Sequence, residues 1–272
     1  MTVALDGVRY RYPAGDSDAL RDVTLAFGAG EVTLVTGRLG AGCSTLLLVA
    51  AGLAPHVTGG ARSGSVTTLG VDPASDKGRR KVAGRIGLLL PTPWTQLSGM
   101  SYTVREEVAF GPANLGWPRD RIGRAVSGAM ALVGIEHLAD RDPRTLSGGE
   151  LQRVMLAGIT AMDPEVLLLD EPTLELDPEG ARMVYRLLPA LAREKTVVLA
   201  TTDVDRAVEV VTRVVLLDRG SVTADGTPDD VLGTDRAVAL GCSTTIAEIV
   251  RVAGHAAPFP LTVRAAVRRF AR

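Results

Sequence analysis

Alternating apolar and polar positions dominate the first part of the chain. Val8 to Tyr12 and Val23 to Phe27 both alternate, and a turn-rich segment from Pro13 to Asp18 separates them. Such a period of two predicts half-buried strands. Glu31 to Thr36 is a third strand-like segment that leads into a glycine-rich stretch, and Ser44 to Ala51 then continues without Gly or Pro. The pattern predicts strand, loop and helix in that order.

The middle of the chain, from about Thr95 to Met162, changes to helical spacing. Apolar side chains recur at helical intervals in three segments separated by Gly and Pro, namely Val104 to Phe110, Arg119 to Val133 and Gly149 to Ala161. This spacing predicts amphipathic helices. We therefore expect a helical insertion over about 95–162.

Continuous apolar runs return after this insertion. Val166 to Leu169 and Thr196 to Ala200 flank a helical segment from Ala181 to Ala192, an order that is typical of parallel strands joined by a crossover helix. Another apolar run follows from Val210 to Leu217, and from about Asp235 the sequence becomes helical and rich in arginine. We predict a main domain over 1–234 and a C-terminal helical extension over 235–272.

Composition and charge narrow the functional classes. The 272 residues, 46% of them hydrophobic, are sufficient for one large core, and a net charge of −1 gives no electrostatic footprint for nucleic acid. Cys43 and Cys242 are the only cysteines, which fits a reducing cytosol and excludes a disulfide framework. Because no apolar run approaches the ~20 residues that span a bilayer, we expect a protein that is soluble or peripheral to a membrane.

A phosphate-binding loop is the first candidate for chemistry. Gly37, Gly40 and Gly42 have the spacing of such loops, and the hydroxyls of Ser44 and Thr45 close the motif. Cys43, however, stands where these loops carry lysine. The loop N–H groups and the following helix dipole still attract phosphate, so the sequence predicts weakened ATP binding. Loss of a comparable electrostatic stabiliser costs roughly 3–4 kcal/mol in the barrier, so we expect impaired hydrolysis.

The cationic and thiol groups of this loop lead to two further expectations. Arg38 lies within the loop, whereas the lysines, at positions 77, 81 and 195, are distant in sequence. Arg38 is therefore a candidate substitute whose geometry the sequence does not define. The position of Cys43 at a helix N-terminus predicts a lowered pKa for its thiol. Bound nucleotide should then shield Cys43 from alkylation.

An acidic pair and a glycine-containing corner complete the candidate chemistry. Asp170 ends an apolar strand, where its carboxylate and the Ser44 hydroxyl are expected to hold Mg²⁺, and Glu171 is placed to polarise an attacking water. Residues 147–149, with sequence Ser-Gly-Gly, precede a helix and predict a second anion-binding corner. Glu150 also completes a helix-capping box with Ser147, and the two roles are compatible.

These motifs resemble those of the nucleotide-binding subunits of ABC transporters. The signature is Leu146 to Glu150, the second nucleotide motif is Val166 to Glu171, and the likeness covers about residues 3–232. It implies an α/β P-loop NTPase fold with a parallel-sheet RecA-like core, an antiparallel β subdomain and a helical signature subdomain. Segments 102–112, 161–165 and 260–263 are most similar to the ATPases of energy-coupling factor and cobalt-type importers.

The resemblance assigns further site residues. Tyr12 is expected to stack on adenine, whose face an aromatic ring can cover. Asp177 matches the aspartate that communicates between paired sites, although Leu174 and Glu175 replace the small residues usual near it. Gly148, Gly149 and Ser147 would contact the ATP of a partner subunit.

The resemblance also identifies departures that weaken one pocket. Besides Cys43, Pro91 stands where the family has a glutamine that senses metal and water, and Thr202 stands where it has a histidine that contacts the γ-phosphate. Gln96 matches a second glutamine of the pattern, and a shifted loop would present it instead. The three histidines lie outside this context, so we interpret them as surface or packing residues.

These departures predict how the chain works with others. ABC ATPase domains pair head to tail, so a homodimer would place Cys43 and Thr202 in both pockets. We therefore expect a heterodimer with a second ABC ATPase, bound with a transmembrane coupling subunit and a substrate-binding membrane subunit. ATP and Mg²⁺ are the expected ligands, nucleic acid is not a partner, and the location is cytoplasmic, on the inner face of the membrane.

Two alternatives remain open at this stage, and two others are less compatible with the sequence. The chain could be a nucleotide-binding scaffold or regulator without catalysis, or a homodimeric ABC ATPase. An ABC protein acting on nucleic acid or ribosomes would usually carry a second linked domain or a long basic insertion. A small-molecule P-loop kinase would give the signature no role. The transported substrate is not encoded visibly, so vitamins, cobalt and nickel all remain candidates.

Overall fold

The computed structural model describes residues 1–271, which form an α/β fold with two sheets. The strands are β1 (Val3–Arg11), β2 (Leu20–Phe27), β3 (Val32–Gly37), β4 (Ala61–Thr68), β5 (Ile86–Leu89), β6 (Val166–Asp170), β7 (Thr196–Ala200), β8 (Arg213–Asp218) and β9 (Ser221–Gly226). The longer helices are α1 (Cys43–Ala50), α2 (Asp76–Val82), α3 (Val104–Asn114), α4 (Arg119–Leu132), α5 (Gly148–Ala161), α6 (Pro178–Ala192), α10 (Thr245–Val252) and α11 (Val263–Phe270). Shorter helices are α7 (Val204–Ala207), α8 (Pro228–Leu232) and α9 (Asp235–Ala239), with 3₁₀ turns at Pro93–Gln96, Glu136–Leu138 and Pro143–Thr145.

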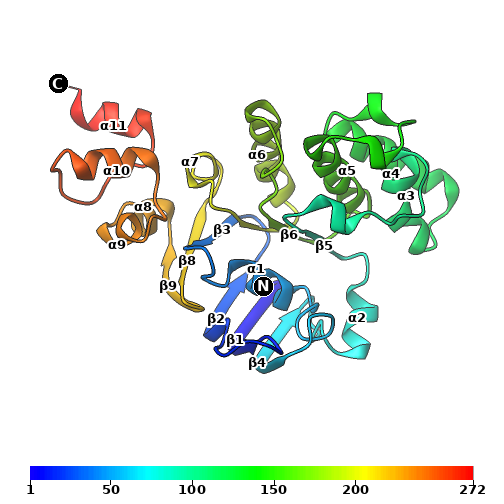
Figure 1. The fold of residues 1–272 in the computed structure, drawn as a ribbon, viewed down its shortest axis with the longest axis horizontal. Helices are drawn as coiled ribbons and strands as arrows, with labels where there is room; N and C mark the ends of the chain where they lie inside the picture. Colours follow the sequence, from blue (N-terminus) through cyan, green and yellow to red (C-terminus); the bar gives the residue numbers. More distant parts are fainter. Residues whose placement is uncertain (272) are drawn as a thin grey trace.

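The larger sheet has the strand order β5-β6-β7-β3-β8-β9, and the smaller sheet has the order β2-β1-β4. All pairs in the larger sheet are parallel except β8 with β9, and all pairs in the smaller sheet are antiparallel. Parallel sheets normally need both faces covered, and here helices cover one face while α1 and the smaller sheet cover the other (Figure 1). The predicted combination of parallel core, antiparallel sheet and helical region is confirmed.

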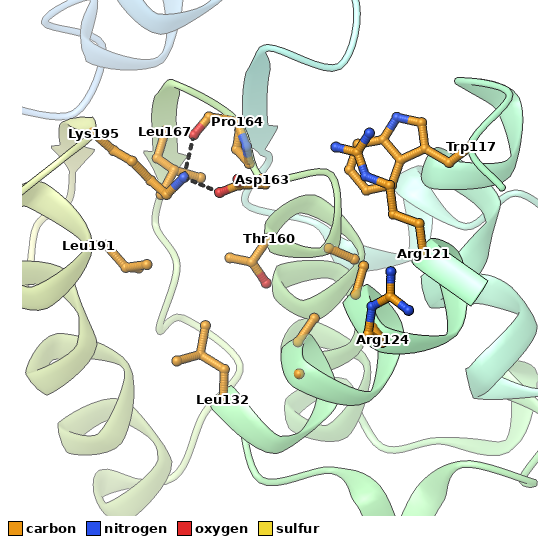
Figure 2. A pocket seen from close by; sticks show the side chains of 14 residues that line it. Trp117, Arg121, Arg124, Leu132, Thr160, Asp163, Pro164, Leu167, Leu191 and Lys195 are labelled. Carbon is orange, nitrogen blue, oxygen red and sulfur yellow. Dashed lines mark hydrogen bonds and ion pairs between the residues drawn. The ribbon is translucent and has the colours of Figure 1, made fainter. Parts of the chain in front are cut away.

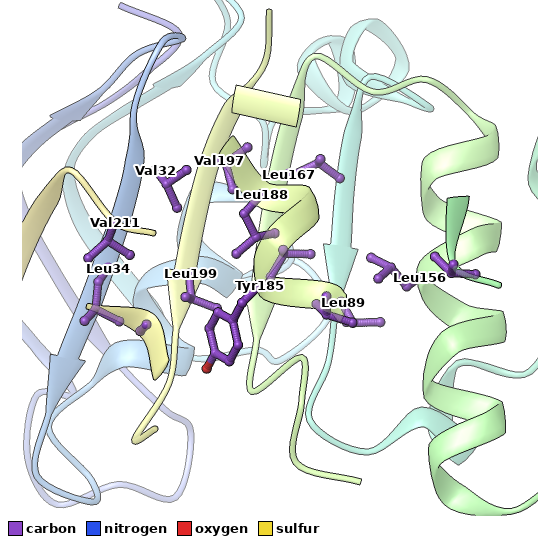
Figure 3. Packing of buried hydrophobic residues seen from close by; sticks show 14 of the residues in the cluster. Val32, Leu34, Leu89, Leu156, Leu167, Tyr185, Leu188, Val197, Leu199 and Val211 are labelled. Atoms are coloured by element: carbon purple, nitrogen blue, oxygen red, sulfur yellow. The ribbon is translucent and has the colours of Figure 1, made fainter. Parts of the chain in front are cut away.

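Alternate side chains of the central strands enter two different hydrophobic clusters. Leu167 and Leu169 of β6 join the cluster under the helices, whereas Val166 and Leu168 join the cluster with α1. Strands β3 and β7 divide their side chains in the same way, and Figure 3 shows their contribution to the first cluster together with side chains of α6. Because both faces are apolar, these strands appear in the sequence as continuous hydrophobic runs.

The predicted helical segments form α3, α4 and α5, at one end of the long dimension of the molecule (Figure 1). A capping box begins α3, since the Thr103 hydroxyl accepts from the Glu106 N–H at 3.2 Å and Glu106 Oε2 accepts from the Thr103 N–H at 3.1 Å. One boundary differs from expectation. The N–H groups of Val210 and Val211 donate to the Ala207 carbonyl and close α7, so strand β8 begins only at Arg213.

Helices α9 to α11 lie at the opposite end of the molecule and make up the proposed extension (Figure 1). Their buried side chains Ala237, Val238, Cys242 and Phe259 belong to the same hydrophobic cluster as the sheet. The extension is therefore packed onto the main core. Within residues 1–271, no helix combines the length and apolar character needed to cross a membrane.

Candidate nucleotide-binding site

A cavity of about 580 Å³ lies beyond the carboxyl ends of the parallel strands, where ligands bind in open α/β sheets. It brings together ten of the residues predicted from the sequence, although they come from four separate parts of the chain. These are Tyr12, Gly37, Gly40, Gly42, Cys43, Ser44, Thr45, Asp170, Glu171 and Thr202. Pro91 and Leu174 also line the cavity.

Glycines give the phosphate loop its path. Gly40 and Gly42 have φ values of +80° and +106°, a region that favours glycine, and a Cβ atom on Gly37 would lie 2.4 Å from the Leu217 carbonyl oxygen. Helix α1 begins after Gly42 without a side-chain cap. No side chain therefore competes for the first N–H groups of α1, which are donors suited to an anion.

Tyr12 follows β1 and lies beside this loop. Its hydroxyl is 3.1 Å from the Thr45 Oγ1 atom, and the ring meets the Tyr10 ring edge-on with centroids 4.9 Å apart. These contacts hold the half-buried Tyr12 ring at the cavity wall. The position suits the predicted contact with a flat base.

The lowered pKa predicted for the Cys43 thiol is wrong. Burial raises the pKa to about 12, and the nearby Asp170 carboxylate adds to the rise. The expectation considered only the helix N-terminus, which favours a thiolate. In the folded chain the loss of hydration and the adjacent negative charges outweigh that effect, so Cys43 is a neutral thiol.

Asp170 and Ser44 form the candidate metal site. Burial raises the pKa of Asp170 to about 6, a hydrogen bond from Ser44 acts in the opposite direction, and the neighbouring Glu171 raises it further. A desolvated carboxylate beside a hydroxyl is a hard oxygen set of the kind that Mg²⁺ prefers. Since residues 1–271 contain no cluster of three or more His, Cys, Asp or Glu side chains that could hold a metal, the other ligands would come from nucleotide and water.

Glu171 is held in place from two sides. It has a φ of +46°, its Oε2 atom accepts from the Thr201 hydroxyl at 2.8 Å, and its Oε1 atom accepts from the Thr202 N–H at 2.8 Å. Thr202, in the expected histidine position, thus contributes its backbone to the site. Sequence reasoning missed Thr201, whose only signal was its position at the end of a strand beside that of Glu171.

Gln96 does not line the cavity, so it does not take the place of Pro91 as a shifted loop would require. Its amide accepts from the Leu90 N–H at 2.7 Å and donates to the Leu88 carbonyl at 2.9 Å. These bonds satisfy backbone groups at the end of β5. Pro91 remains at the cavity wall and has no side-chain donor to offer.

Arg38 lines the cavity, but its guanidinium is directed to the C-terminal extension. Nε donates to the Leu240 carbonyl at 3.1 Å and Nη2 donates to the Ala239 carbonyl at 3.0 Å. Among the described residues that line this cavity, Arg38 is the only Lys or Arg. The cation closest to the phosphate loop in sequence is therefore engaged elsewhere.

The predicted second corner is separate from this cavity. The Ser147 hydroxyl accepts from the Glu150 N–H at 3.3 Å, and Glu150 Oε2 accepts from the Ser147 N–H at 2.8 Å. The capping box is thus confirmed, and Arg141 adds an ion pair to Glu150 at 3.1 Å. The hydrogen bonds from Ser147 lower the pKa of Glu150, so this carboxylate stays charged.

The loop between β6 and α6 packs against the corner. Glu175 is exposed, but its Oε2 atom lies 2.5 Å from the position that a Cβ atom on Gly148 would occupy. A side chain at position 148 would therefore displace the Glu175 carboxylate from this contact. Asp177 lies outside the cavity and caps α6, since its Oδ1 atom accepts from the Gly180 N–H at 2.7 Å.

A second cavity of about 480 Å³ separates α4 and α5 from α6 (Figure 2). On one side the Lys195 ammonium donates to the Asp163 carboxylate at 2.5 Å and to the Pro164 carbonyl at 2.8 Å. On the other side the Arg121 guanidinium stacks 3.4 Å from the centre of the Trp117 ring. This cavity shares no lining residue with the first and contains none of the predicted site residues.

The phosphate loop between a strand and a helix, the acidic pair on a neighbouring strand and the helical signature region define an ATP-binding cassette. A profile of the ABC transporter family matches residues 20–174. The chain belongs to the ABC transporter family, as an ATP-binding domain, and ATP is the ligand of that family.

Curated relatives show which ABC proteins the chain is similar to. The chain is 39% identical, over 84% of its length, to the energy-coupling factor transporter ATP-binding protein EcfA2 of Methanospirillum hungatei, of which it covers 56%. The leading relatives from two Methanosarcina species are longer still, and the chain spans 39% and 37% of their lengths.

Solved structures agree with the sequence relatives. The fold matches cbiO1 of Clostridium perfringens, described as part of the ABC transporter complex cbiONQ, with a TM-score of 0.74 and 31% identity over 93% of this chain and 99% of that one. It also matches the cassette MJ0796 bound to ADP and Pi, with a TM-score of 0.73 and 26% identity over 83% of this chain and 98% of that one.

Proposed function

We propose that this chain is the ATP-binding subunit of an energy-coupling factor-like ABC importer and works with a different ABC ATPase. Its own pocket binds ATP but hydrolyses it poorly. Its corner at Ser147, Gly148 and Gly149 completes the competent pocket of the partner. The expected location is the inner face of the cell membrane, where transmembrane coupling and substrate-binding subunits would receive the conformational change.

The contrast between the two sites within one chain carries this proposal. The phosphate loop has a half-buried neutral thiol at Cys43 and no lysine, while the corner keeps a complete capping box. In a head-to-tail homodimer both pockets would have the first defect. A partner with an intact loop gives the preserved corner a use.

The pocket residues have distinct proposed roles. Ser44 and Asp170 would hold Mg²⁺, which neutralises phosphate charge when it is bound. Glu171, fixed by Thr201 and the Thr202 N–H, would orient and polarise water, and Tyr12 would stack on the base. Asp177 would communicate with the partner, as the family resemblance implies.

Relatives support the importer class. One is described as an energy-coupling factor transporter ATPase, and a solved structure with the same fold is described as part of a transporter complex. Because the chain spans only part of several relatives, its substrates and partners rest on this proposal.

Reconstitution tests the proposed heterodimer. The purified chain alone should hydrolyse ATP slowly, and addition of a partner ATPase with lysine, glutamine and histidine at the departed positions should restore turnover. Ser147→Arg should then abolish the restored activity, because its long cationic side chain fills the corner. Ser147→Ala, which removes the hydroxyl and a helix cap worth about 1 kcal/mol but adds no bulk or charge, should lower the restored activity less than Ser147→Arg.

Each alternative predicts a different outcome. Rapid turnover by the isolated chain would favour a homodimeric ATPase and contradict the proposal. Absence of turnover with every intact partner, despite ATP-dependent association, would identify a scaffold or regulator. The position of Glu171 argues against a scaffold, because its carboxylate is held by Thr201 and the Thr202 N–H although a chain without catalysis would not need it.

A further inference from the structure

The C-terminal extension contacts the phosphate loop of the proposed nucleotide pocket and the helix that follows the wall at Thr202. Arg38 of the phosphate loop donates two hydrogen bonds to the carbonyls of Ala239 and Leu240, at 3.0 and 3.1 Å. These carbonyls end helix α9, where the helix dipole favours a cation. Arg38 therefore has a defined binding site on the extension.

Next to the wall at Thr202, helix α10 is bound to helix α7. The Asp205 carboxylate accepts from the Thr245 N–H at 2.8 Å and from the Thr245 hydroxyl at 2.6 Å. Helix α7 begins directly after Thr202 and Asp203, and the Thr202 N–H holds Glu171. The extension is thus connected to the segment that positions the proposed catalytic carboxylate.

The two ligands available to Arg38 differ in strength. At α9 it meets neutral carbonyl oxygens with partial negative charge, whereas a nucleotide would offer phosphate oxygens with full charge. The guanidinium bonds to the carbonyls have one charged partner, whereas bonds to phosphate join two opposite full charges and add their Coulomb attraction. Arg also binds phosphate in a bidentate manner. Cys43 supplies no charge, and among the described residues that line the cavity no other Lys or Arg competes with Arg38 for the phosphates.

We propose that Arg38 is a shared cation, which the C-terminal extension holds on α9 and which the phosphates of a bound nucleotide take over. Arg38 is then a positioning residue on α9 and a phosphate ligand in the occupied pocket. Docking of the extension lowers the affinity of the phosphate loop for ATP, and ATP weakens that docking by the same factor. This inference rests on the proposed function, since it requires nucleotide in this pocket.

Binding measurements with the full chain can test the sharing of Arg38. Affinities for MgATP, MgADP and adenosine are measured by calorimetry for the wild type, Arg38→Met and Arg38→Lys. Arg38→Met should weaken MgATP binding roughly tenfold, as expected for a hydrogen bond to a charged group, and should leave adenosine binding unchanged. Arg38→Lys should recover part of the loss, because it keeps the charge but lacks the fork.

Loosening the extension gives a change of opposite sign. Asp205→Ala removes both bonds to Thr245 while Arg38 stays intact, and it should strengthen MgATP binding roughly threefold. Thr245→Ala, which removes only the hydroxyl bond, should have a smaller effect in the same direction. In an Arg38→Met background both substitutions should have no effect, since the shared cation is gone. Thermal unfolding confirms that each variant is folded.

The outcomes separate this inference from the proposed function. Failure of the folded wild-type chain to bind MgATP would overturn both. Wild-type binding that Arg38→Met leaves unchanged would overturn only the sharing of Arg38. Weaker MgATP binding in Asp205→Ala, or an equal effect of this substitution with and without Arg38, would show that the extension merely supports the pocket and would also overturn it.

Discussion

The two helix ends that we propose as anion-binding sites have opposite designs. Helix α1 begins after Gly42 with no side-chain cap, whereas α5 begins after Ser147 with a reciprocal capping box and an adjacent ion pair. The first leaves its N–H groups open to a ligand, and the second satisfies part of its own donors. Cys43 in place of a lysine changes the first end only, which is why we propose that the chain keeps the function of the second.

The carboxylates near the two helix ends differ in the same way. Burial raises the pKa of Asp170 to about 6, while hydrogen bonds from Ser147 lower the pKa of Glu150. The phosphate-loop pocket thus contains the carboxylate of Asp170 without an ion pair to a cationic side chain among the described residues. At the corner, Arg141 forms an ion pair with the Glu150 carboxylate.

The largest expected effect concerns the thiol. With a pKa of about 12, Cys43 should react with iodoacetamide at pH 8 roughly a thousandfold more slowly than an ordinary thiol, whose pKa is about 8.5. Peptide-resolved mass spectrometry of a labelling time course measures this rate and distinguishes Cys43 from Cys242. Labelling as fast as that of free glutathione would mean that the pocket is more hydrated than described. Bound MgATP should slow labelling further by covering the loop.

Restoring the missing cation is the next test. Cys43→Lys should raise ATP turnover by the isolated chain roughly hundredfold, because a buried positive charge stabilises phosphate charge in the transition state. Cys43→Met is the matched control, with similar length and no charge, and should give no gain. Equal turnover in the two variants would show that Pro91 or Thr202, not Cys43, limits the pocket.

The smallest effect is a pH dependence that only the phosphate-loop pocket should show. Because Mg²⁺ needs the ionised carboxylate, Mg²⁺-dependent nucleotide affinity should fall as pH drops below about 6, by up to about tenfold per pH unit. Asp170→Asn should remove this dependence, which distinguishes it from titration of the nucleotide itself. Calorimetric titrations at several pH values between about 5 and about 7.5, on both sides of the raised pKa, would measure this pH dependence of nucleotide affinity.

The same shift has the opposite sign for folding. The pKa of Asp170 is raised above its unfolded value, so the folded chain binds this proton more tightly. The contribution of Asp170 to stability therefore increases as pH falls from about 6 towards about 4. Glu150, with a lowered pKa, contributes stability at neutral pH that is lost on acidification.

Local sequence signals predicted most of the fold. Strands β1 to β3 and helices α3 to α5 follow from periods of two and of about 3.6, and from caps such as Thr103 and Ser147 that lie next to their partners in sequence. The pocket residues also came from motifs, because glycine spacing and an acidic strand end are local features. Their assembly in one cavity follows from the parallel order of the strands.

Features that depend on distant segments were not predictable. Arg38 meets Leu240, and Thr201 meets Glu171, through contacts between parts of the chain that no local pattern joins. The pKa of Cys43 was predicted in the wrong direction for the same reason, since burial and the charge of Asp170 arise only after folding. Gln96 had the residue type of a site residue, but its backbone partners in β5 decided its role.

Glu175 has a consequence for encounters between subunits. Its carboxylate lies against Gly148. In the proposed heterodimer, closure over the partner's ATP would therefore replace this carboxylate with a phosphate, and repulsion between the two anions would slow the approach of the subunits. Higher ionic strength should screen this repulsion between carboxylate and phosphate, so added salt should speed closure even while it weakens other polar contacts.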